Sequence, residues 1–203
     1  MMKRVVLSIM VAACLWFLMF SPWTASLVPF WPAMTCSALL LTCLALFFGG
    51  RPALSMKMTD VLWGVVIAIA LWGVFWLGDK VSQWIFSFAR PQVNLIYSMK
   101  DGQSTVWLAL ALLLIIGPAE EIFWRGYIQR TLVSRFGANT AFLLATAAYT
   151  LVHLPSLNFM LIMAALVCGV MWGGLYRLFP QHFTAIMVSH ALWDAAAFVW
   201  FPF

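Results

Sequence analysis

Long apolar stretches, separated by short polar segments, occupy most of the chain. Seven of them fall near residues 5–21, 31–48, 61–78, 106–124, 138–154, 157–178 and 183–201. A helix needs about 20 mostly apolar residues to cross about 30 Å of hydrocarbon. The pattern therefore predicts an all-α fold, a polytopic transmembrane helical bundle of about seven spans. The range is six to eight, because the first, second and fifth stretches are short.

The segment 81–99 is too polar to span a bilayer, and we expect it to be interfacial or re-entrant and to be interrupted by Pro91. No internal repeat, soluble domain or long linker divides the chain, so residues 1–203 are expected to form a single integral membrane domain. Gly169 and Gly173 form a GxxxG pattern, which allows helices to approach closely. We expect this pattern to serve packing within the chain.

The first residues resemble a signal peptide. Lys3 and Arg4 precede an apolar run over residues 5–20, and Thr24-Ala25-Ser26 is a weak match to a cleavage site. An uncleaved first span is the favoured interpretation, because the rest of the protein is equally apolar.

Composition supports the membrane assignment. Hydrophobic residues make up 65% of the chain and charged residues 8%, against about half and about a quarter in soluble domains, so a soluble fold is excluded. The net charge of +5 does not indicate a nucleic-acid partner, because the cations are scattered singly between apolar segments.

The cations predict the orientation instead, since cytoplasmic loops hold the excess of Lys and Arg. With the N-terminus inside, only Lys80, Arg90 and Lys100 lie outside. The inside group is then Lys3, Arg4, Arg51, Lys57, Arg125, Arg130, Arg135 and Arg177. We expect an integral membrane protein with a cytoplasmic N-terminus, as in a bacterial inner (plasma) membrane, with the lipid bilayer as a partner.

Acidic residues are rare enough to single out a site. Asp60, Asp79 and Asp101 fall in predicted loops, which leaves Glu120, Glu121 and Asp194 in apolar surroundings. Ionisable residues at bilayer depth are costly and usually mark functional sites. The alternative is a structural ion pair, and for Glu121 this alternative is strong. Glu121 and Arg125 are spaced i, i+4 and can neutralise one another, whereas Glu120 is rotated by about 100° on the helix and is the freer carboxylate.

Two histidines extend the candidate site. A turn is expected at Arg135-Phe136-Gly137, with Glu120 16 residues before Phe136 and His153 17 residues after it. In a hairpin of two helices both side chains would lie about 25 Å from the turn, which suits a pair that activates water. In the last span, His190 and Asp194 share a helix face. Either pair alone could be a buried hydrogen bond, but three spans with buried polar groups favour a site.

These motifs resemble those of the CPBP (Abi) family of membrane proteases, which includes type II CAAX prenyl endopeptidases and bacteriocin-processing and immunity proteins. The resemblance covers roughly residues 104–203, the expected catalytic core. The family's EExxxR motif appears as Glu120, Glu121 and Arg125, and its HxxxN or HxxxD motif as His190 and Asp194. Its FxxxH motif appears as Tyr149 to His153, with Tyr in place of Phe.

The resemblance implies a role for each of these residues. Glu120 would be the general base on a water that His153 helps to hold, and His190 with Asp194 would stabilise the oxyanion. Glu121 and Arg125 would support them. An ionised Asp194 would repel an oxyanion, so the residue would donate as a protonated acid or orient His190 instead.

The cofactor, substrate and rival functions stay open at this stage. Two histidines and two carboxylates are able to bind zinc, and the family has been described both as metalloproteases and as metal-independent glutamic proteases. The chain has no HExxH motif, and we favour the glutamic mechanism without a cofactor. The expected substrate is a membrane-associated protein or peptide. The alternatives are a non-catalytic immunity or scaffold protein and a small transporter, although the chain lacks the paired half-chain repeats of many transporters.

Overall fold

The computed structural model describes residues 1–55 and 57–203, and this part of the chain is helical and contains no strand. The α-helices are α1 (Met2–Phe20), α2 (Phe30–Gly49), α3 (Met58–Ile85), α4 (Ala89–Ser98), α5 (Thr105–Ala111), α6 (Gly117–Phe123), α7 (Arg130–Leu151), α8 (Phe159–Leu178) and α9 (Phe183–Ala195). Short 3-10 segments are η1 (Ala25–Leu27), η4 (Leu154–Ser156) and η5 (Pro180–His182), and π-helical segments are η2 (Leu112–Ile116), η3 (Trp124–Gln129) and η6 (Ala196–Trp200). The predicted helical bundle is confirmed.

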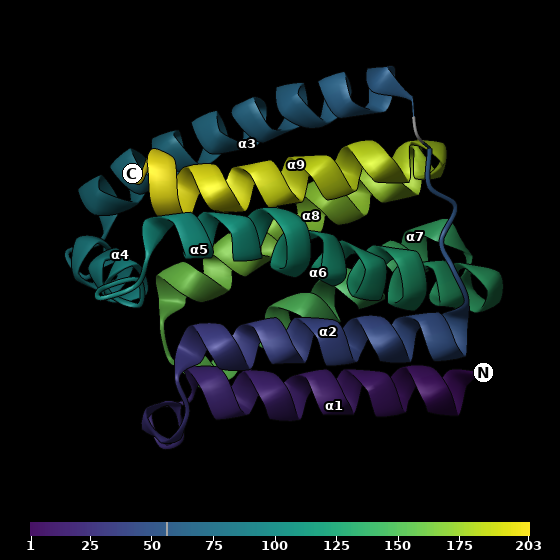
Figure 1. Ribbon diagram of the computed structural model, residues 1–203, viewed down its shortest axis with the longest axis horizontal. Helices are drawn as coiled ribbons and strands as arrows, with labels where there is room; N and C mark the ends of the chain where they lie inside the picture. The colour runs from purple at the N-terminus through teal and green to yellow at the C-terminus, as the bar shows by residue number, and fades with distance from the viewer. Residues whose placement is uncertain (56) are drawn as a thin grey trace.

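The long helices lie side by side with similar axis directions (Figure 1). Helix α3 packs against α9, α1 against α2, and α7 against α8, while α6 contacts both α2 and α9. The first helix belongs to this packing, because Ala12, Trp16 and Met19 are buried on its inner face. Helix α6 is therefore enclosed by the bundle, which matters for the two glutamates that it carries.

In the part of the chain that the structure describes, six helical stretches are long and apolar enough to cross a membrane, and the longest, Thr105–Ser156, has 52 residues. At 1.5 Å per residue a straight helix of this length would measure about 78 Å, far more than a bilayer. The chain instead turns back at Gly137, whose φ of 75° favours glycine. Trp124 and Tyr149, on the two sides of this turn, have ring centroids 5.3 Å apart. The predicted turn is confirmed, and this stretch comprises two of the seven predicted spans.

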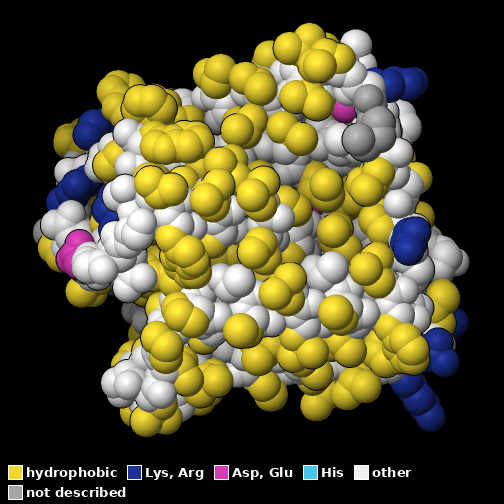
Figure 2. Space-filling view, in the orientation of Figure 1, with side chains coloured by type: hydrophobic (Ala, Val, Ile, Leu, Met, Phe, Trp, Pro, Cys, Tyr) yellow, Lys and Arg dark blue, Asp and Glu magenta, His cyan; other side chains and the backbone are white. Residues whose placement is uncertain are grey.

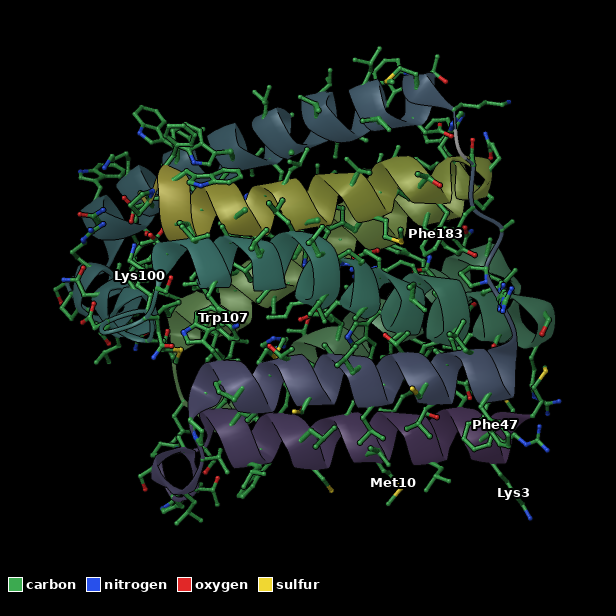
Figure 3. All side chains as sticks on the ribbon, in the orientation of Figure 1. Lys3, Met10, Phe47, Lys100, Trp107 and Phe183 are labelled. Atoms are coloured by element: carbon green, nitrogen blue, oxygen red, sulfur yellow. The ribbon has the colours of Figure 1, made fainter. Side chains whose placement is uncertain are left out.

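Apolar side chains cover the middle of the bundle, and Lys and Arg gather at its two ends (Figure 2). Lys3 and Lys100 lie at opposite ends, and Met10 points away from the bundle (Figure 3). The band between the ends includes many exposed large hydrophobic side chains, for instance Met10, Phe47 and Ile69. A surface of this kind suits hydrocarbon rather than water, and the chain is an integral membrane protein.

Asp60 and Asp79 were expected in loops, and this prediction was wrong. Both lie in α3, which is longer than predicted, and both are buried. The carboxylate of Asp60 lies 2.7 Å from Nδ1 of His182. Asp79 accepts hydrogen bonds from Gln83 and Arg90. Burial is tolerated because each carboxylate has polar partners.

The expected interruption at Pro91 was also wrong. The break lies between Ile85 and Ala89, and Pro91 stands in the first turn of α4. A missing N–H costs little there, because the first N–H groups of a helix have no partner within it. With 10 residues, α4 measures about 15 Å and is too short to span the bilayer.

The GxxxG prediction is confirmed: a Cβ on Gly169 would lie 3.1 Å from Thr146 of α7, and Gly173 faces the same residue.

Candidate active site

Helices α6 and α9 approach each other closely enough to join their polar side chains. A Cβ on Gly117, at the start of α6, would lie 2.7 Å from the Cα of Ala191 on α9. Only glycine allows this spacing, since real Cβ atoms do not come so near to backbone. The approach brings Glu121 of α6 within hydrogen-bond distance of His190 of α9.

Glu121 is the fully buried anchor of the polar cluster. Its Oε1 atom accepts hydrogen bonds from Nη1 of Arg125 and from Nδ1 of His190, each at 2.7 Å. Arg125 also donates to the carbonyl of Cys168 at 3.3 Å, and its guanidinium lies over the ring of Tyr149. The structure thus contains the Glu121–Arg125 pair that the i, i+4 spacing predicted. Arg125 is buried in this cluster and contributes little to the cationic end of the bundle.

His190 is oriented by three neighbours. Because an ionised Glu121 can only accept, Nδ1 of His190 carries the proton of their hydrogen bond. The imidazole stacks on Trp172, with ring centroids 3.7 Å apart. Its Nε2 atom lies 3.5 Å from Oδ2 of Asp194, so the predicted His190–Asp194 pair is present but loose. Nε2 is the nitrogen left to face a substrate.

Among residues 1–55 and 57–203, Glu120 makes no hydrogen bond or ion pair of this kind. The residue is 8% exposed, and its Oε2 atom is buried without a hydrogen-bond partner among the described residues. Its side chain lines a cavity that Asp194, His190 and His153 also line. A buried carboxylate oxygen next to a cavity is a natural binding position for water. The structure therefore agrees with the prediction that Glu120 is the freer of the two glutamates.

His153 reaches the same cavity, but both of its ring nitrogens are occupied. Nδ1 lies 2.8 Å from the carbonyl of Tyr149, which can only accept, so Nδ1 carries a proton. Nε2 accepts a hydrogen bond of 3.1 Å from the indole N–H of Trp16. The hairpin therefore places Glu120 and His153 on one cavity, as predicted. Within the described part of the chain, however, no hydrogen bond joins them.

The cavity has a volume of about 520 Å³, which lies within the usual range for small-molecule and peptide side-chain sites. Most of its lining is aromatic or aliphatic, from residues such as Phe20, Trp31 and Val74 on α1, α2 and α3. A second polar position, at Asp79 and Ser82 of α3, also borders the cavity. The cavity thus combines an apolar wall with a small polar region around Glu120.

The donor groups do not fit a zinc site. Among residues 1–55 and 57–203, no three side chains of His, Cys, Asp or Glu are placed to share a metal ion. The chemistry agrees, because both nitrogens of His153 have protein partners and Nδ1 of His190 is held by Glu121. A structural zinc site needs four ligands, and a catalytic site needs three.

Sequence reasoning missed two tryptophans of this site. Trp16 holds His153, and Trp172 supports His190 while its own N–H donates to Ser189 at 3.0 Å. Neither stands at a motif spacing from its histidine. In a chain with 12 Trp residues, nothing in the sequence distinguishes these two from ordinary interfacial or core residues.

Comparison with known proteins identifies a matching family model. No curated protein and no solved structure matches the chain significantly. The family model of the Rce1-like type II CAAX prenyl endopeptidases matches residues 102–196, a segment slightly shorter than half of the chain that includes all three motifs. Over this segment the chain is similar to the Rce1-like type II CAAX prenyl endopeptidases, the resemblance that the three motifs indicated.

Proposed function

We propose that this protein is an intramembrane endopeptidase of the glutamic type. The observation that carries the proposal is the carboxylate of Glu120, which has an unpaired buried oxygen and borders a cavity shared with His153, His190 and Asp194. Such a cavity can admit water at a depth where lipid would otherwise exclude it. Residues 104–203 are the proposed catalytic core.

In the proposed reaction, Glu120 removes a proton from a bound water while the water oxygen attacks the carbonyl carbon of the scissile peptide. A tetrahedral oxyanion forms. It collapses as the C–N bond breaks, and the proton held by Glu120 passes to the leaving amine. The products are a carboxylic acid, which keeps the second proton of the water, and an amine, and Glu120 returns to its ionised state.

The oxyanion would be stabilised from α9. Because Nδ1 of His190 is committed to Glu121, the ring donates to the oxyanion through Nε2, in the form that carries both protons. Asp194, 3.5 Å from that nitrogen, helps to orient the ring or donates as a protonated acid. Glu121 and Arg125 support His190 without touching the substrate.

His153 is proposed to help hold the water from the wall of the cavity. For its Nε2 atom to bind water directly, Trp16 has to give up its hydrogen bond. With that bond in place, His153 shapes the polar part of the cavity as a fixed, neutral ring.

The apolar wall indicates a membrane-associated protein or peptide substrate with an apolar segment or lipid group near the cleaved bond. A processing or sorting signal, a secreted peptide precursor and a lipid-modified tail all have this property.

We further propose a cytoplasmic N-terminus in a plasma membrane such as the bacterial inner membrane. Seven of the eight predicted inside cations support this orientation, Arg125 being held in the site.

The test is a proteomic comparison of cells that carry the wild-type protein, Glu120→Gln or the matched surface control Asp101→Asn. Asp101 is exposed in a turn, so its variant should process substrates normally. We expect Glu120→Gln, His153→Ala and His190→Ala each to lower cleavage at least about 100-fold and to leave membrane insertion intact. The precursor that accumulates with Glu120→Gln would identify the substrate. Wild-type cleavage by Glu120→Gln protein would refute the proposal.

A non-catalytic immunity or scaffold role is the competing function, and the occupied nitrogens of His153 are the observation that favours it. Full biological activity of the Glu120→Gln variant, together with no cleavage by the wild type, would establish this alternative.

A further inference from the structure

Helix α1 provides a side chain to the candidate site, although it lies outside the family-matched segment. Trp16 is completely buried, and its N–H donates to Nε2 of His153, 137 residues away in the chain. This is a hydrogen bond between two buried side chains, and nothing in the sequence links them. It requires explanation beyond packing, because filling the space takes an indole-sized ring but does not take an N–H donor directed at His153.

The contact determines the chemical state of His153. The carbonyl of Tyr149 requires a proton on Nδ1, and the indole N–H of Trp16 requires a lone pair on Nε2. Both conditions hold only for the neutral ring with its proton on Nδ1. As long as Trp16 donates, the ring can carry no second proton.

The contact also determines where the ring lies. The rings of Trp16, Phe20 and Tyr149 surround the imidazole with centroids 6.0, 5.6 and 5.2 Å away. Phe20 and Tyr149 limit the space around the imidazole, and the hydrogen bond to the carbonyl of Tyr149 fixes its Nδ1 side. The directional bond from Trp16 fixes the Nε2 side, because hydrogen bonds weaken steeply away from linear geometry.

We propose that Trp16 is a positioning residue of the active site: its indole N–H holds His153 neutral and in one orientation on the wall of the cavity. This inference rests on the proposed function. It makes α1 part of the catalytic unit, so that the unit extends beyond residues 104–203. It also explains why α1, in which Trp16 is buried, packs against the 3-10 segment η4 that directly follows His153.

The test compares wild-type protein, Trp16→Phe and the matched control Trp72→Phe in lipid nanodiscs. Trp72 also donates its indole N–H, to the carbonyl of Phe201 at 2.9 Å, but it does not line the cavity. We expect Trp16→Phe to lower kcat about 10-fold, with KM within about twofold of wild type, since misplacing a reacting group affects the chemical step. Trp72→Phe should keep both constants.

Ring ¹⁵N resonances of the three histidines provide a readout that needs no activity. Wild-type His153 should show one protonated nitrogen and one unprotonated nitrogen, and Trp16→Phe should change the resonance of the unprotonated one. If Trp16→Phe protein does not fold, benzothienylalanine at position 16 retains the shape of the indole without its N–H.

The outcomes separate the two proposals. Unchanged kcat and unchanged His153 resonances in the Trp16 variants would overturn the positioning role while leaving the protease assignment intact. A rise in kcat would overturn it as well, because Trp16 would then compete with the catalytic water. Absence of cleavage by wild-type protein would refute the proposed function. The hydrogen bond between Trp16 and His153 would then have no catalytic role, even if the spectra detect it.

Discussion

At the scale of single residues, two adjacent glutamates have opposite surroundings. Each has one buried oxygen without a partner, but the other oxygen of Glu121 accepts hydrogen bonds from Arg125 and His190, whereas Glu120 lines the cavity. Consecutive helical residues differ by about 100° in direction, so one side chain can support the fold while its neighbour reaches the substrate. The same carboxylate chemistry thus serves stability at one position and reactivity at the next.

This difference predicts opposite effects on stability. Glu121→Gln leaves Arg125 and His190 buried without their counter-charge, and breaking a buried pair in this way costs about 3–5 kcal/mol. Among the described residues Glu120 makes no ion pair, so Glu120→Gln breaks none and should leave stability unchanged or slightly higher. Thermal unfolding of both variants in the same detergent is the measurement. Equal losses of stability would contradict the separate roles of the two residues.

At the scale of elements, helices α6 and α9, which carry Glu120, Glu121, His190 and Asp194, adjoin π-helical turns. Helix α6 lies between η2 and η3, and η6 begins two residues after Asp194. A π turn inserts a residue into the helical repeat and rotates the following side chains, and such turns are frequent at functional sites. This geometry explains how α6 can direct Glu120 toward the cavity while Arg125, beyond its end, still meets Glu121.

The close contact between α6 and α9 predicts a strong effect at one glycine. Gly117→Ala would place a methyl group against the backbone of Ala191, and overpacking of this kind costs about 1–3 kcal/mol. It should also separate Glu121 from His190 and lower cleavage more than binding. The control is Gly73→Ala in α3, where nothing lies within 4 Å of the added carbon and stability should rise by about 0.5–1 kcal/mol. Equal behaviour of the two variants in unfolding and cleavage assays would refute this account.

Local spacing made part of the site predictable. Glu121 and Arg125, and His190 and Asp194, are one helical turn apart, and such neighbours can be read along a helix. The bond from His190 to Glu121 joins residues 69 positions apart, and Trp16 is still farther from His153, so tertiary packing alone decides those contacts. Asp60 was assigned to a loop for the same reason, because His182, which allows its burial, is 122 positions away.

At the scale of the whole molecule, the spans were predictable because bilayer thickness imposes a length on every apolar helix. The hairpin around Gly137 was predictable too, since a 52-residue apolar stretch cannot cross once. The end of α3 and the start of α4 were not, because amphipathic residues near a membrane surface satisfy either a helix or a turn. The position of the cavity also depends on how all the helices pack, which no single segment determines.

The placement of the two charged ends predicts a labelling pattern. Gln103 precedes α5, and Ser134 lies near the turn at Gly137; both are exposed. About 30 helical residues separate them, or about 45 Å, so they should lie on opposite sides of the bilayer. With a cytoplasmic N-terminus, a membrane-impermeant thiol reagent should label Gln103→Cys in intact cells and Ser134→Cys only after permeabilisation. The parent protein, whose native cysteines lie within helices α1, α2 and α8, is the background control. The reverse labelling pattern would show that the protein has the opposite orientation with the same fold. Labelling of both cysteines from one side would contradict the transmembrane hairpin that positions Glu120 and His153.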